Sequence, residues 1–313
     1  MQRCLRCVLD VALPVSSRVA QVKPRNLGIC RFVPAIIICL SAIAQPIQGW
    51  SNDGMQASTS RAARQEAIRS IPLKKINPKY RQAVQQVLEG SSLYRRLPTQ
   101  MVDCNPQLFT FLAQNPEMLV EVWRYLGITK VDLQRTGTNA FRITDNAGTT
   151  GKLLIVEQEC DQQAQNRIVL YAEGAYEGKP FKQPVRAQCV LLLRSGSFTE
   201  TNDREYVAAR LDSFIHIDRT SIELFAKAVH PLVGRTADRN FGDTLQFISN
   251  LSGEAEARPE TIEKLVTRLP RVSPQRQQQF IRIAYQCNAN DESRTSDTSS
   301  TVRRVARVED SSR

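Results

Sequence analysis

Histidine is scarce in this chain of 313 residues: there are only two, His216 and His230. A protein zinc site normally takes three or four ligands, so two histidines alone do not make one. The sequence also lacks the G-x-S-x-G segment of serine hydrolases and the H-E-x-x-H helix of metalloproteases. These absences leave no catalytic or metal-ligating residue to nominate, and no cofactor is expected.

One segment, residues 146–152, resembles a phosphate-binding loop. Its first glycine is replaced by Asn146, and Leu153 stands where Ser or Thr would contact the metal ion. We therefore expect a hairpin turn there.

Runs of like charge are also missing. The formal net charge is +11, but no five basic residues follow one another. Clustered basic residues are typical of nucleic-acid binding, so nucleic acid is not expected as a partner. The positive charge favours at most a peripheral contact with anionic membrane surfaces.

The longest apolar run, Phe32–Ala44, has thirteen residues, whereas a membrane-spanning helix needs about 20. It follows a basic residue and ends in the small-residue pattern Ala42-Ile43-Ala44, which is typical of a secretory signal. We predict export to the periplasm or the outside after cleavage near Ala44. An N-terminal membrane anchor is the alternative.

Four cysteines follow the predicted signal: Cys104, Cys160, Cys189 and Cys287. Their wide spacing excludes a C-x-x-C zinc pattern. An even number in an oxidising compartment permits two disulfides with three connectivities. Four buried thiols are the alternative, since free cysteine is common in protein cores.

Composition divides the chain into segments. Residues 1–44 form the signal segment and residues 45–70 a polar linker. Residues 71–253 form the main domain, residues 254–287 a helical appendage, and residues 288–313 a tail with too few apolar residues to fold.

Within the main domain the order is helices, strands, helices. Three Asn-Pro pairs, at residues 77, 105 and 115, mark helix starts, because Asn caps a helix and Pro fits its first turn. Alternating patterns predict about six strands, at residues 131–136, 140–144, 152–159, 167–176, 187–198 and 205–217. Their short connections favour antiparallel neighbours. Helices return at residues 222–251, 259–269 and 273–287, and the fold class is α+β.

The two histidines lie at either end of a strand-to-helix junction. In the strand 205–217, Leu211 and Ile215 lie on the predicted core face and His216 on the more polar face. Thr220 and Glu223 form a capping box that begins a short helix. Pro231 ends that helix, so His230 is predicted to occupy a corner.

The stretch FIHIDRTSIELFAKAVHPLVGRTADRNFGDTLQFISNLS, residues 214–252, resembles the START-like, helix-grip family of lipid- and small-ligand-binding domains. The resemblance covers roughly residues 93–252. It implies a curved antiparallel sheet packed on a long C-terminal helix, with N-terminal helices and an extra C-terminal helical pair. The candidate ligand-binding residues are Leu211, Ile215, Phe241, Leu245 and Ile248.

These features predict an exported, non-enzymatic protein that holds an apolar or lipid-like ligand between sheet and long helix. One alternative is an envelope structural or interaction protein with a filled core, which binds a protein partner and no small ligand. Another is an enzyme that uses Arg210, Asp212 and His216 on the polar strand face.

Overall fold

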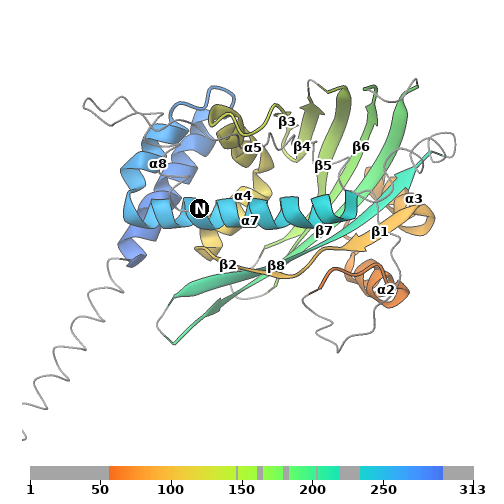
Figure 1. The fold of residues 1–313 in the computed structure, drawn as a ribbon, viewed down its shortest axis with the longest axis horizontal. Helices are drawn as coiled ribbons and strands as arrows, with labels where there is room; N and C mark the ends of the chain where they lie inside the picture. The colour runs from red at the N-terminus through yellow and green to blue at the C-terminus, as the bar shows by residue number, and fades with distance from the viewer. Residues whose placement is uncertain are drawn as a thin grey trace, which may run out of the picture.

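The computed structural model describes residues 56–145, 147–160, 165–178, 183–201, 204–218 and 233–291. They form an α+β structure with helices on both faces of one open antiparallel sheet (Figure 1). The strand order is β1-β8-β7-β6-β5-β4-β3, and β2 also pairs with β8. The class and the antiparallel sheet agree with the sequence prediction, but the sheet has eight strands instead of about six.

The strands are β1 (Leu93–Arg96), β2 (Gln100–Asp103), β3 (Asp132–Gly137), β4 (Ala140–Thr144), β5 (Thr149–Glu159), β6 (Asn166–Tyr176), β7 (Val185–Thr199) and β8 (Glu205–Ile217). The helices are α2 (Arg61–Ser70), α3 (Pro78–Gly90), α4 (Pro106–Gln114), α5 (Pro116–Tyr125), α7 (Val233–Ala257) and α8 (Pro259–Val266), and residues 274–291 form one more.

The two additional strands, β1 and β2, together make one edge of the sheet. Both pair antiparallel with β8, where Leu93 lies opposite Ile215 and Gln100 opposite Ala209. Pro98 separates them, because proline has no N–H to donate to a strand ladder. At four residues each, these strands are too short to give an alternating pattern in the sequence.

The predicted helix starts are present, with one difference in capping. The side chain of Asn77 accepts a hydrogen bond from the Lys79 N–H, and that of Asn105 accepts from the next helix in the same way. Asn115 makes no such bond to α5. Its Nδ2 instead donates to the Phe111 carbonyl, 2.8 Å away, so this side chain closes the end of α4.

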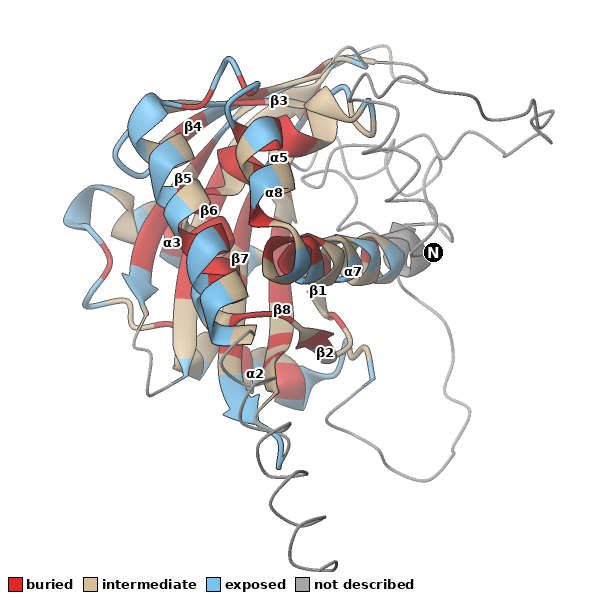
Figure 2. Ribbon diagram, turned by 90° about the vertical axis from the view of Figure 1, so that its left-hand side faces the viewer, coloured by how far each residue is buried: buried red, intermediate tan, exposed pale blue. Residues whose placement is uncertain are grey.

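Parts of both faces of the sheet are buried. On one face, α2 and α3 cover a cluster that includes Val190, Leu192 and Phe214. On the other, α4 and α5 pack near Cys189 and Ile215. Figure 2 shows buried residues along the strands. The prediction that one face of β8 is the polar face is wrong in this respect, since Phe214 is fully buried there.

Residues 61–70 are folded, although the sequence places them in the polar linker 45–70. They form α2, which buries Ala63 and Ala67 and joins the cluster on the sheet through Ala67. The buried side chains are two alanines in a helix rich in Arg and Gln, so the apolar stripe is too weak to recognise in the sequence.

The C-terminal helices share a core with the rest of the fold. The boundary expected at residue 253 falls inside α7, which continues to Ala257. Phe280, in the helix 274–291, packs against Phe111 of α4 with ring centroids 5.6 Å apart. This helix also includes residues 288–291 of the predicted tail.

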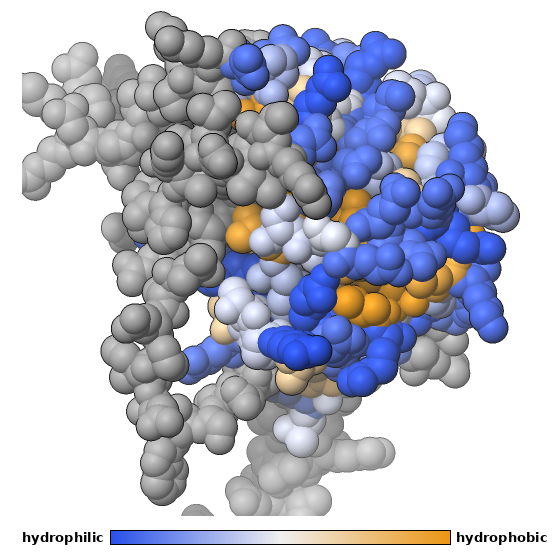
Figure 3. Space-filling view, turned by 90° about the vertical axis from the view of Figure 1, so that its right-hand side faces the viewer, coloured by the Kyte–Doolittle hydropathy of each residue, from blue (hydrophilic) through white to orange (hydrophobic). Residues whose placement is uncertain are grey.

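Several predictions fall outside the described residues: the signal segment 1–44, the capping box at Thr220, His230, and the tail from residue 292. Cys104, Cys160, Cys189 and Cys287 are not joined in disulfides, and all but Cys160 are buried. The right-hand side of the molecule in Figure 1 is mostly hydrophilic, with a narrow apolar band between polar side chains (Figure 3).

Candidate functional site: a groove between α7 and β2

The five residues predicted to line a ligand cavity belong to different packed clusters. Ile215 is 1% exposed and packs among the strands, while Leu245 and Ile248 join the helical core with α4 and α8. Leu211 and Phe241 are half-buried near Leu97 and Ala237. Ile215, Leu245 and Ile248 are packed in these clusters, and Leu245 also lines a groove.

Arg210 and Asp212 of β8 belong to an ion cluster, which we define as Glu66, Tyr94, Arg96, Arg194, Arg210 and Asp212. Asp212 has no exposed surface. Its carboxylate accepts hydrogen bonds from Arg96 Nε at 2.7 Å, from Arg194 at 2.9 Å and from the Tyr94 hydroxyl at 2.7 Å. Glu66, which α2 contributes, also bonds to Arg96 and Arg194. The cluster therefore ties α2 to the sheet.

The three residues considered for an enzyme do not converge on one point. Asp212 is occupied by two guanidinium groups, and Arg210 lies 3.6 Å from Glu66. His216 Nδ1 lies 2.6 Å from the Gly90 carbonyl at the end of α3. Each of these residues thus has a structural partner. Among the described residues, no group of His, Cys, Asp and Glu is arranged to hold a metal ion.

Glu66 should make the free energy of unfolding depend on pH in the acidic range. Hydrogen bonds from Arg194 lower the pKa of Glu66 from 4.5 to about 2. A lowered folded-state pKa stabilises the fold above pH 4.5, and this contribution is lost as the pH falls toward 2. Urea unfolding between pH 6 and 2 should show a steeper loss of stability for the wild type than for Glu66→Gln. Parallel pH profiles would contradict this role for Glu66.

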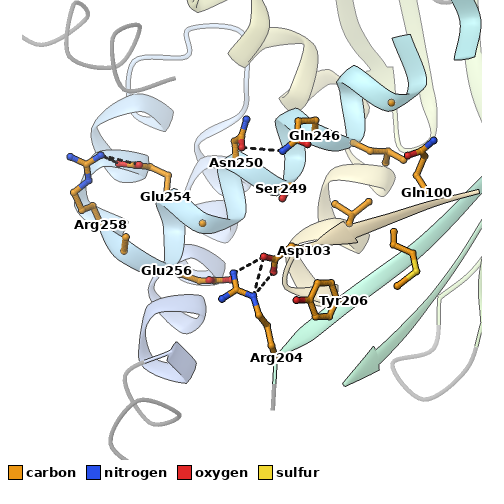
Figure 4. A pocket seen from close by; sticks show the side chains of 16 residues that line it. Gln100, Asp103, Arg204, Tyr206, Gln246, Ser249, Asn250, Glu254, Glu256 and Arg258 are labelled. Carbon is orange, nitrogen blue, oxygen red and sulfur yellow. Dashed lines mark hydrogen bonds and ion pairs between the residues drawn. The ribbon is translucent and has the colours of Figure 1, made fainter. Parts of the chain in front are cut away.

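A groove of about 630 Å³ runs between the C-terminal half of α7 and the strands β2 and β8 (Figure 4). On the strand side it is lined by Gln100, Met101, Val102, Asp103, Arg204 and Tyr206. On the helix side it is lined by Gly242, Leu245, Gln246, Ser249, Asn250, Gly253, Glu254, Glu256 and Ala257, with Arg258 just beyond. Val102 and Leu245 make the inner wall apolar, and the rims are mostly polar.

Two glycines face this groove from within α7. Glycine inside a helix costs about 0.5–1 kcal/mol relative to alanine. A Cβ atom added at Gly242 or Gly253 would meet nothing within 4 Å, so packing does not explain either glycine. Their small size leaves space beside the helix, together with Ser249 between them.

Charged side chains gather at one end of the groove. Arg204 and Asp103 form an ion pair with a shortest separation of 2.6 Å, and Arg258 lies 2.7 Å from Glu254. Figure 4 shows these side chains around the end of the groove where Glu256 also lies. This end can bind polar or charged groups, whereas the stretch near Val102 and Leu245 can bind apolar ones.

Most of these groove residues were not predicted from the sequence. The available signal was the pair Gly242 and Gly253 inside an otherwise regular amphipathic helix, because an unexplained glycine in a helix often has a packing or functional reason. The contribution of β2 gave no signal, since the strand itself was not recognised.

Comparison with known proteins adds a distant structural similarity. No family model matches the chain, and no curated protein is similar to it in sequence. One similar solved structure is a conserved protein from Geobacillus kaustophilus, which is 10% identical, with a TM-score of 0.34 over 50% of this chain and 93% of that one. A similarity of this size assigns neither a family nor a function.

Proposed function

We propose that the chain is an exported, non-enzymatic binding protein of the START-like, helix-grip type, which holds a partly apolar ligand between its sheet and α7. The observation that carries this proposal is the groove along α7 and β2. Of the five residues predicted to line a cavity, Leu245 lines this groove.

The connectivity supports a helix-grip fold. The first strand pair, β1 and β2, lies beside the last strand, β8, and α4 and α5 follow β2 before the remaining strands. The long helix α7 comes after β8 and packs along β2. A sheet edge and a helix that are far apart in sequence thus form the two walls of the proposed site.

Export remains part of the proposal and rests on the apolar segment before Ala44. Within the part of the chain that the structure describes, no helix is long and apolar enough to cross a membrane. The groove end with Asp103 and Arg204 suits a ligand that is polar at one end.

The test is to fill the groove from α7. Ser249→Trp places a large side chain between the walls, and Gly253→Phe does so one turn further along. Protein purified from its native host should carry a stoichiometric compound, found by mass spectrometry of organic and aqueous extracts. Either variant should lose this compound while keeping its circular dichroism spectrum.

Asp243→Trp is the matched control, because Asp243 is exposed on the same helix but does not line the groove. This variant should retain the compound. Equal amounts in Ser249→Trp and wild type, or a blank in both extracts, would count against a co-purifying small ligand in the groove.

A second function, an envelope interaction protein without a small ligand, is favoured by one observation. Ile215, Leu245 and Ile248 are each no more than 5% exposed and belong to hydrophobic clusters of buried residues. In this function the same groove would receive part of another protein.

A further inference from the structure

We propose that the ligand of this groove is an extended peptide segment of another protein, which adds a strand to the free edge of β2. This inference rests on the proposed function, because it names the ligand class of the same site. It follows from which β2 residues line the groove.

All four consecutive residues of β2, Gln100–Asp103, line the groove. Neighbouring side chains of a strand point to opposite faces of the sheet, so a groove on one face would be lined by every second residue only. Lining by consecutive residues means that the groove runs along the edge of the strand. A ligand in it therefore meets the β2 backbone.

That edge has backbone groups available for pairing. Within the described residues, β2 pairs with β8 and with no other strand. In an antiparallel pair, every second residue directs its N–H and C=O away from the partner strand. An extended peptide satisfies such groups with main-chain hydrogen bonds, whereas a lipid chain satisfies none of them.

The side chains at this edge could contact the alternating side chains of an added strand on both of its faces. Met101 lies opposite Ala208, on the same side of the sheet as Tyr206. Met101 is 56% exposed, and Tyr206 stacks on Phe198 with ring centroids 5.6 Å apart. An apolar peptide side chain beside Met101 would cover this surface, and the next one would point toward Val102 and α7.

The length of the groove and the charges that line it limit which peptides would fit. The α7 wall from Gly242 to Arg258 is about 24 Å long at 1.5 Å per residue, which matches roughly seven extended residues. The charged end is lined by three carboxylates, from Asp103, Glu254 and Glu256, and by two guanidinium groups, from Arg204 and Arg258. This excess of negative charge favours a Lys or Arg at that end of the peptide.

The experiment selects peptides and then tests their backbone. A random heptapeptide library is selected for binding to the wild-type protein, with counter-selection against Ser249→Trp. The best peptide is synthesised with N-methyl groups on alternate residues, in each of the two registers. Strand pairing uses the N–H groups of one register, so one methylated set should bind about tenfold more weakly or worse, and the other within about threefold. Amide exchange in residues 100–103 should slow on binding.

Two results would contradict the proposal that the ligand is a peptide. One is a selection that yields no peptide specific for the open groove, and the other is equal binding of both methylated sets. If either result came together with a lipid that is extracted from wild type but is absent from Ser249→Trp, the groove would still be a binding site. Its ligand would then be the lipid and not a peptide. If neither peptide binding nor the amount of extracted ligand differed between Ser249→Trp and wild type, the proposed function would fail as well.

Discussion

Replacing Asp212 with asparagine should destabilise the fold by about 3–5 kcal/mol, the usual cost of removing one partner from a buried ion pair. Asp212 is fully buried, and its carboxylate binds both Arg96 and Arg194. The neutral amide would leave these two guanidinium groups with Glu66 as their remaining carboxylate partner in the cluster. Urea unfolding at pH 7 measures the change.

The matched control is Asp218→Asn, which makes the same substitution just beyond the end of β8. Asp218 is exposed, so its loss should change stability by no more than about 0.5 kcal/mol. If Asp212→Asn were equally mild, Asp212 would lie on an open polar face, as predicted from the sequence, and α2 would not cover it.

The second large effect is expected at Phe280, where alanine should cost about 3–5 kcal/mol through lost contacts and the cavity left behind. Phe280 is fully buried between the C-terminal helices and α4, against Phe111. Because this core includes residues from α4, α5, α7 and α8, the whole protein should unfold at lower denaturant in a single transition.

Tyr285→Ala provides the comparison on the same helix. Tyr285 is 43% exposed, and its hydroxyl donates a hydrogen bond to Glu263. Its replacement should cost about 1 kcal/mol or less. Separate unfolding of the C-terminal helices in Phe280→Ala, with the sheet intact, would instead support the independent appendage predicted for residues 254–287.

Local patterns determined much of the fold. The Asn-Pro pairs predicted where α3, α4 and α5 begin, because capping and proline geometry act within one helical turn. Alternation and short turns predicted the antiparallel strands β3–β8, since neighbouring strands are also neighbours in sequence.

Local patterns did not predict which side chains of β8 are buried, because burial depends on the segments that pack over the strand. Asp212 reads as a polar-face residue within its own strand. It is buried because Glu66 and Arg96, more than 100 residues earlier in the chain, complete an ion cluster over it. No local pattern records such a partnership.

The candidate site depended on tertiary structure even more. The sequence by itself determined the class, the order of the elements from α3 onward except β1 and β2, and the amphipathic face of α7, all of which follow from interactions between residues close in the chain. Only the tertiary structure decided that β2 lies at a free edge beside α7 and that Gly242 and Gly253 face the space between them. A groove has no sequence pattern of its own, because its two walls meet only when distant segments pack.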